Sequence, residues 1–146
     1  MAANMFKKYT ESKTREWAVP VGTQSGDVVI NAQSGEVGVA LGDRGDGTRA
    51  ANIPGVTGGT VPSGMVGVRP GGAVVAVDGS WLLTVAGVTD GDTGAGGAGT
   101  DEGTEVYRIA ADGTYTTTAS GNTYIGVIDD GVIVGGVAPV KIGPVV

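Results

Sequence analysis

VVAVDGSWLLTV, residues 74–85, consists of two apolar runs joined by Asp78-Gly79. Asp-Gly tolerates the positive φ angles of a two-residue hairpin turn, so the sequence predicts a β-hairpin here. In the predicted register Val77 lies opposite Ser80, and apolar side chains emerge on both faces. A hairpin that is apolar on both faces belongs in a barrel or sandwich, or beneath another subunit.

The rest of the composition also favours strands and turns. Gly occurs 29 times, Val and Thr abound, and Leu occurs only at positions 41, 82 and 83. Short extended segments alternate with turn signals, most clearly in the hairpins expected within residues 28–41 and 105–119. We expect an all-β protein: a single small β-barrel or sandwich of short antiparallel strands, with long Gly-rich loops and an N-terminal arm.

Two kinds of segment interrupt this pattern. Residues 1–16 are polar and lack strand alternation, so we expect an N-terminal arm there and one β-domain over residues 17–146. Residues 42–64 and 87–103 are rich in Gly and are longer than ordinary connections, which predicts two long surface loops. We expect the second loop to be solvated and flexible.

The absence of two residue types limits the catalytic and metal-binding chemistry that the chain can perform. The chain has no Cys and no His, which excludes disulfides, thiol nucleophiles, imidazole bases and nearly every zinc, copper or haem site. We therefore expect no cofactor and no metal. No run of about 18 apolar residues and no apolar signal core are present, so we expect no membrane partner and synthesis in the cytoplasm.

Charge divides unevenly along the chain. The net charge is −6, but residues 1–16 hold four basic and two acidic residues and carry +2, so the remainder carries −8. An acidic body repels phosphate, and we expect no nucleic-acid partner.

Residues 92–95, DTGA, match the motif of aspartic proteases, in which two such Asp residues share a proton and activate water. In that family large apolar residues precede the Asp, whereas Asp90-Gly91 precedes Asp92. The flanking sequence argues against a protease, and we expect Asp92 to be dispensable.

The glycine run that follows matches two binding motifs incompletely. Gly94, Gly96 and Gly99 satisfy GxGxxG, but residues 100–104 start no helix to meet a pyrophosphate. Residues 96–101 also resemble the start of a calcium-binding β-roll repeat, but no second copy follows. The acidic residues of this loop can attract a cation, so loose cation binding stays an open alternative.

Five segments, in this order, carry a resemblance to a known family: SGDVV (25–29), GVAL (38–41), PGGAVVAVDGSW (70–81), the run from EVY (105–107) to TTTASGN (116–122), and IGV (125–127). With them the chain resembles the small β-rich capsid decoration, or cement, proteins of tailed bacteriophages, particularly phages of actinobacteria. The resemblance spans most of residues 17–142. It implies a non-enzymatic virion protein on the outer capsid surface that binds the major capsid protein, often as a homotrimer.

Two other classes stay open, a β-structured tail or host-adhesion module and the protease based on Asp92. For a decoration protein, basic and apolar residues of the arm are candidates for contacts with the capsid or a neighbouring subunit. Trp81 is a candidate anchor between subunits, or else a residue of the monomer core. The candidate contact residues are Met5, Phe6, Lys7, Lys8, Tyr9, Lys13, Arg15, Trp17 and Trp81.

Overall fold

The computed structural model describes residues 5–7, 14–45, 48–50, 60–62 and 70–143. Every regular element in these residues is a β-strand, which confirms the all-β fold class. They include no helix long and apolar enough to cross a membrane. The chain divides into two compact units, where an arm followed by one domain was expected. We refer to residues 1–3 and 13–77 as the sheet unit, and to residues 4–12 and 78–146 as the barrel unit.

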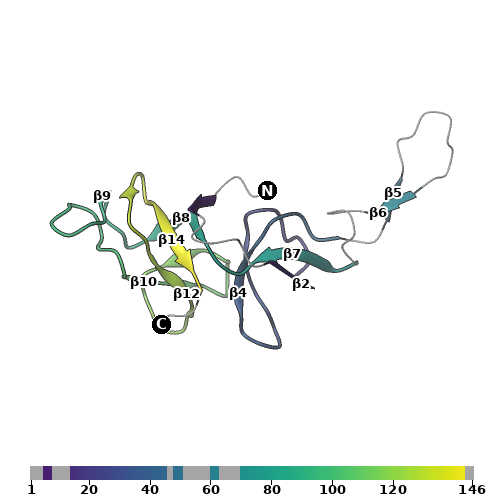
Figure 1. Cartoon of the computed structure of the whole chain (residues 1–146). Helices are drawn as coiled ribbons and strands as arrows, with labels where there is room; N and C mark the ends of the chain where they lie inside the picture. Colours follow the sequence, from purple (N-terminus) through teal and green to yellow (C-terminus); the bar gives the residue numbers. More distant parts are fainter. Residues whose placement is uncertain (1–4, 8–13, 46–47, 51–59, 63–69, 144–146) are drawn as a thin grey trace. The chain divides into compact units, whose positions relative to one another are not determined.

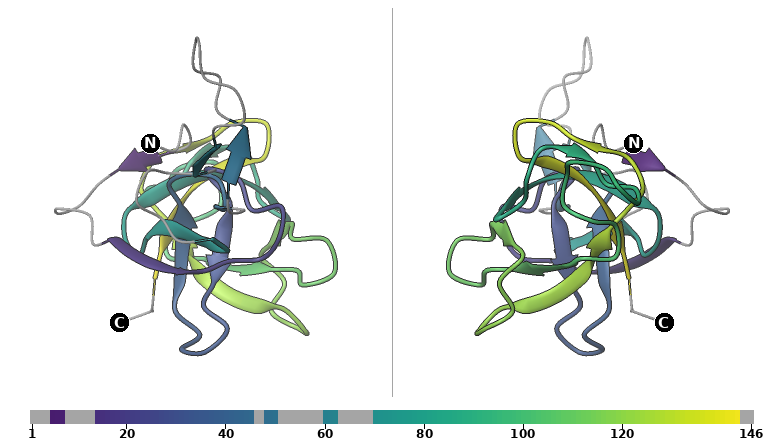
Figure 2. Two further views of the ribbon diagram at one scale, coloured as in Figure 1. Left: turned by 90° about the vertical axis from the view of Figure 1, so that its right-hand side faces the viewer. Right: turned by 90° about the vertical axis from the view of Figure 1, so that its left-hand side faces the viewer.

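The sheet unit contains a four-stranded antiparallel sheet with the order β2-β7-β4-β3. β3 and β4 form the hairpin predicted within residues 28–41, and Gly35 in its turn has a φ of 73° (Figure 2). Two further strands, β5 and β6, pair within the predicted loop 42–64. The bounds are β2 (Thr14–Ala18), β3 (Val28–Ile30), β4 (Val37–Ala40), β5 (Thr48–Ala50), β6 (Thr60–Pro62) and β7 (Gly72–Ala76).

One apolar cluster packs on this sheet. Trp17 of β2 lies opposite Ala73 of β7 and is 6% exposed. Val75, two residues along β7, shares that face and is fully buried. Trp17, Val19, Val29, Ala73 and Val75 form the cluster, with Val77 packed against it. Fully burying one such aliphatic side chain contributes about 1.5–3 kcal/mol, so this cluster supplies much of the stability of the sheet unit.

The barrel unit closes its main sheet. Its five strands follow the order β8-β11-β10-β12-β14, and β14 pairs again with β8 (Figure 1). All neighbours are antiparallel except β8 and β11, and β10 and β11 form the hairpin predicted within residues 105–119. β9 and β13 form a separate two-stranded sheet. Along the chain, β9 follows β8 and β13 precedes β14. The bounds are β1 (Met5–Lys7), β8 (Ser80–Ala86), β9 (Gly91–Asp92), β10 (Glu105–Arg108), β11 (Tyr115–Thr116), β12 (Thr123–Ile128), β13 (Val132–Ile133) and β14 (Val137–Ile142).

The side chains of β8 show which face points into the barrel. Trp81, Leu83 and Val85 are buried, whereas the alternate residues Leu82, Thr84 and Ala86 are exposed. This period of two is the expected alternation of a barrel strand between a packed interior and an outer surface. The other fully or almost fully buried residues of the barrel strands are Val106, Ile125, Ile128, Ala138, Pro139, Val140 and Ile142.

The hairpin predicted over residues 74–85 is wrong. Asp78-Gly79 does turn the chain, with Gly79 at a φ of 94°, but it links two different sheets. β7 pairs with β2 and β4 on its two edges, and β8 pairs with β14 on one edge and with β1 and β11 on the other. Because both edges of each strand are occupied, no edge is left for pairing β7 with β8.

The predicted arm also contains regular structure. Residues 14–16, placed at the end of the arm, are the first residues of β2. Met5–Lys7 form β1, which pairs with β8 of the barrel. Backbone pairing therefore overrides the polar side-chain pattern at these positions.

Candidate functional site

The described candidate contact residues lie on three strands, one in the sheet unit and two in the barrel unit. Met5, Phe6 and Lys7 lie in β1, Arg15 and Trp17 in β2, and Trp81 in β8. Lys8, Tyr9 and Lys13 lie outside the described residues. Among the described members of the set, the strand pairing that joins two of them is that of β1 with β8, where Met5 pairs with Trp81.

Trp81 is a core residue, not a surface anchor. Its side chain is fully buried, and its indole N–H donates to the carbonyl oxygen of Asp78 at 3.2 Å. A partner could contact this ring only after the barrel opened locally, so Trp81 is corrected from an interface candidate to the core alternative. Trp17 is also a core residue, because only 6% of its surface is exposed.

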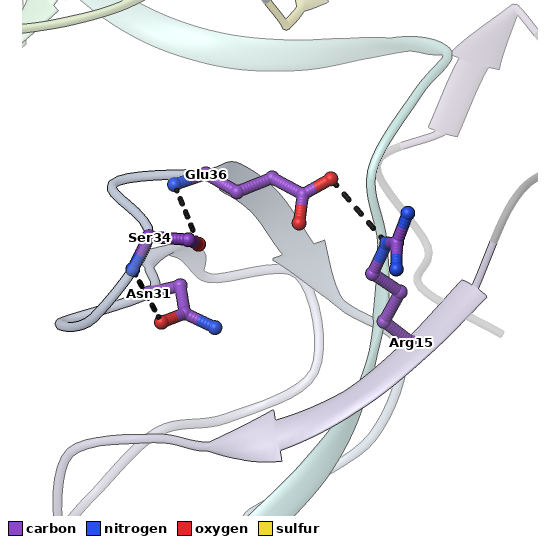
Figure 3. A network of polar contacts seen from close by, with 4 residues as sticks. All are labelled: Arg15, Asn31, Ser34 and Glu36. Carbon is purple, nitrogen blue, oxygen red and sulfur yellow. Dashed lines mark hydrogen bonds and ion pairs between the residues drawn. The ribbon is translucent and has the colours of Figure 1, made fainter.

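Arg15 remains accessible, but its charge already has a partner. Its Nε lies 3.4 Å from Oε1 of Glu36, and the two side chains are 59% and 37% exposed (Figure 3). The Glu36 backbone N–H donates to Ser34 Oγ, and the Ser34 N–H donates to Asn31 Oδ1. These contacts fix the loop that carries Glu36. An exposed ion pair contributes only about 0.2–1 kcal/mol, so Arg15 can exchange Glu36 for an external carboxylate at little cost.

The loop around Asp92 has the geometry of a structural turn. Asp92 is exposed, and its Oδ1 accepts from the N–H of Gly94 at 2.7 Å. Thr93 is 1% exposed, and its hydroxyl lies 2.9 Å from the carbonyl oxygen of Asp129 and also accepts from the N–H of Gly131 at 2.9 Å. Thr93 therefore anchors the loop, and the Asp92 carboxylate accepts the hydrogen bond that closes its turn.

The glycine run of this loop is tightly packed, contrary to the expected flexible loop. A Cβ on Gly97 would lie 2.3 Å from the carbonyl oxygen of Asp92, and one on Gly99 would lie 2.4 Å from that of Gly91. The Gly99 N–H donates to the Asp92 carbonyl at 3.0 Å. These glycines are needed because the backbone strands approach too closely for any side chain.

Asp90 clamps the same loop to the turn before β14. Its two carboxylate oxygens accept from the N–H groups of Gly135 at 2.8 Å and Gly136 at 2.9 Å. The bonds from Gly136 and then Gly135 lower the pKa of Asp90 below its usual value. Within the described part of the chain, no three acidic side chains come together to hold a metal ion.

Sequence reasoning missed a pair of tyrosines on the barrel. Tyr107 of β10 and Tyr124 of β12 are cross-strand partners, with ring centroids 6.0 Å apart and planes at 76°. The Tyr107 hydroxyl donates to the Glu105 carboxylate, and this bond raises the pKa of Tyr107. Burial, followed by the charge of Glu105, raises the pKa of Tyr124. Their spacing in sequence gave no signal, because a register shift between Val106 and Tyr107 brings them together.

Acidic charge is concentrated on the barrel. Residues 78–146 contain nine Asp and Glu but only Arg108 and Lys141 as basic residues, a net charge of −7. Residues 1–77 contain six acidic and seven basic residues, a net charge of +1. Comparison with protein-family models, with curated proteins and with solved structures found no match to this chain.

Proposed function

We propose that this chain is a non-enzymatic decoration protein of a tailed-phage capsid. It binds the major capsid protein on the outer surface of the assembled head, as a homotrimer, and stabilises the shell. The family resemblance of residues 17–142 supports this function. The charge distribution is the observation that carries the proposal: residues 78–146, which contain the closed ring, carry −7, whereas the N-terminal segment, residues 1–16, carries +2.

Decoration works by thermodynamic linkage. A ligand that binds the assembled shell more tightly than the loosened shell shifts the equilibrium toward assembly by mass action. Each copy contributes little, but many copies bind one head. The acidic barrel faces solvent in this arrangement, and the basic segment meets acidic groups of the shell.

The basic residues of the N-terminal segment attach the protein to the shell. Trp17 and Trp81 are buried and do not supply this contact. Arg15 can, by leaving Glu36. Lys8 and Lys13 belong to the same basic segment in the sequence. Exposed charge pairs of about 0.2–1 kcal/mol each steer and orient the protein, and the linked segments of a homotrimer add their contributions to the attachment.

The test is binding to undecorated heads at low and high salt. The variant Lys8→Gln with Lys13→Gln should bind more weakly than the parent, and the difference should shrink at high salt. The matched control, Arg108→Gln with Lys141→Gln, removes the same charge from the barrel and should bind at least as well as the parent. Equal binding by all three proteins would contradict attachment through the basic segment, and no binding of the parent to heads would contradict decoration itself.

A second test addresses catalysis. Asp92→Asn should leave head binding unchanged and should alter no peptide-cleaving activity, because the Asp92 side chain is exposed and its carboxylate accepts the N–H of Gly94 within its own turn. Cleavage by the parent that this substitution abolishes would restore the protease alternative.

A further inference from the structure

The two edges of β8 pair with strands from different parts of the chain. β14 pairs with one edge, from Ser80 to Thr84. On the other edge β11 pairs with Val85 and Ala86, and β1 pairs with Ser80 and Trp81. Among the described strands, β1 is thus the only one that covers this edge at Ser80 and Trp81.

β1 is remote in sequence from the barrel to which it belongs. The chain leaves β1, runs through residues 13–77 of the sheet unit, and only then enters β8. The five strands of the closed ring all lie within residues 80–142, so the ring closes through β14 and β8 without β1. β1 is a separable addition to a barrel that is already complete.

The pairing of β1 is also short. It consists of Met5 with Trp81 and Lys7 with Ser80, and a register shift lies between them. Each backbone hydrogen bond contributes only about 0.5–1.5 kcal/mol net, so two residue pairs hold β1 weakly. When β1 leaves, a strand edge is uncovered, and such an edge pairs readily with another extended chain.

Charge favours a basic occupant for this edge. Residues 4–12 contain Lys7 and Lys8 against Glu11, a net charge of +1, whereas residues 78–146 carry −7. A second copy presents a segment with the same charge and the same register. Exchange between copies therefore restores every pairing that opening breaks, which makes it a low-cost route to an oligomer.

We propose that the β8 edge at Ser80 and Trp81 is a strand-exchange site for a second copy of this chain. Met5–Lys7 of one copy pairs there with β8 of the next, so each copy gives one strand and receives one. Such head-to-tail contacts close into a cyclic oligomer when the rotation permits. Exchange requires no capsid and is independent of the proposed function.

Concentration decides between self-pairing and exchange. A strand on a short flexible tether competes for its acceptor at an effective concentration on the order of millimolar, and a longer tether lowers this value. Dilute protein therefore pairs β1 within one chain, and exchange grows as the concentration of copies approaches that value. Concentration dependence is the signature of the proposal.

Because the chain has no Cys, disulfides can report this pairing directly. Cα atoms of antiparallel partners lie about 4.5–5.5 Å apart, within the range that a disulfide spans. Ser80→Cys is a mild change, because Ser80 is fully buried and its hydroxyl has no hydrogen-bond partner among the described residues. The double variant Lys7→Cys with Ser80→Cys should form an intrachain disulfide in dilute solution.

The decisive experiment mixes the two single variants, Lys7→Cys and Ser80→Cys, and oxidises them at about 10 µM and about 1 mM, below and near the effective concentration of the tethered strand. An interchain disulfide between positions 7 and 80 should form, and its yield should rise with concentration. The matched control pairs Lys7→Cys with Ala111→Cys, whose site is exposed on the β10–β11 turn and reports random collision.

The yield with position 80 should exceed that with position 111 by about tenfold, a preference equivalent to about 1.4 kcal/mol. Equal yields at the higher concentration would overturn exchange. So would an intrachain disulfide in the double variant without any interchain disulfide in the mixture. Failure of the double variant to form its intrachain disulfide would overturn the β1–β8 pairing on which the proposal depends.

Discussion

The barrel unit closes its main sheet, whereas the sheet unit leaves its main sheet open at β2 and β3. The closed unit also carries the unbalanced charge. Residues 4–12 and 78–146 together carry −6, and residues 1–3 and 13–77 hold five acidic and five basic residues and carry zero. Closure removes strand edges that could pair with other chains, and net negative charge opposes association between copies of the same unit.

Each unit contains one tryptophan, so the comparison can be measured. Trp17 lies in the core of the sheet unit and Trp81 in that of the barrel unit. Trp17→Phe leaves Trp81 as the only indole reporter, and Trp81→Phe leaves Trp17. Fluorescence of these two variants follows the unfolding of each unit separately.

The largest expected effect is that of Trp81→Ala. This substitution removes a fully buried indole from the barrel and should lower the free energy of unfolding by about 3–5 kcal/mol. Amide hydrogen exchange in β12 and β14 measures the loss without an indole in the barrel. Trp81→Phe is the control and should lose less, because most of the ring volume stays. A loss below about 1 kcal/mol for the alanine variant would show that the barrel core is not built around this residue.

The next effect contrasts two glycines that lie in crowded strands. A Cβ on Gly126 would lie 2.1 Å from the backbone carbonyl oxygen of Lys141, whereas one on Gly38 would lie 2.3 Å from a side-chain carbon of Val75 and 2.7 Å from the backbone carbonyl oxygen of Ala76. The backbone clash is therefore closer at Gly126, in a closed ring whose strands cannot separate independently. Gly126→Ala should therefore cost more than Gly38→Ala, each on the scale of about 1–3 kcal/mol for overpacking.

Urea unfolding checks this contrast, with Gly126→Ala in the Trp17→Phe background and Gly38→Ala in the Trp81→Phe background. Thr84→Ala on the exposed side of β8 is the control and should change stability by less than about 0.5 kcal/mol. A larger cost at Gly38 would reverse the comparison and identify the open sheet as the less adaptable unit.

Local signals in the sequence predicted local structure well. The β3–β4 and β10–β11 hairpins are close in sequence, and Gly35 and Gly113 adopt the positive φ angles that their turns require. The hairpin predicted at Asp78-Gly79 was wrong because a turn dipeptide specifies that the chain reverses direction. It does not specify which strand edges already have partners. The closing pairs between β8 and β14, such as Leu83 with Ala138, connect residues too far apart in sequence for any local pattern to indicate.

The surroundings of the candidate contact residues also depend on pairings between distant segments. Trp81 could have been assigned to the interior because Leu83 and Val85 share its face of the strand, whereas Ser80 and Thr84 lie on the other face. The partner of Arg15 could not have been found, because Glu36 approaches it through the folding of two separate strands. β1 is three residues long, too short for an alternation to be visible.

A smaller effect concerns acid. The N–H groups of Gly136 and Gly135 lower the pKa of Asp90, so this carboxylate stabilises the fold above the ordinary Asp pKa of 3.8, and the stabilisation is lost as the pH falls through the lower folded-state pKa. Asp90→Asn should therefore weaken the barrel unit at pH 6 and make its stability less sensitive to pH between about 5 and 2. Unfolding curves of the Trp17→Phe background across that range measure it. An unchanged acid response would show that the clamp to residues 135–136 contributes nothing to the barrel.

The smallest expected effect is at the Arg15–Glu36 pair of the sheet unit. Both side chains are largely in solvent, so a double-mutant cycle of Arg15→Gln and Glu36→Gln should give a coupling of about 0.2–1 kcal/mol that shrinks at high salt. The cycle is read through Trp17 in the Trp81→Phe background. A coupling above about 2 kcal/mol would mean that the pair clamps the edge strand β2, and that Arg15 is held too firmly to exchange Glu36 for an external carboxylate. A weak coupling is what attachment needs, because a cation that contributes little to its own fold can be transferred to a partner without unfolding the sheet that carries it.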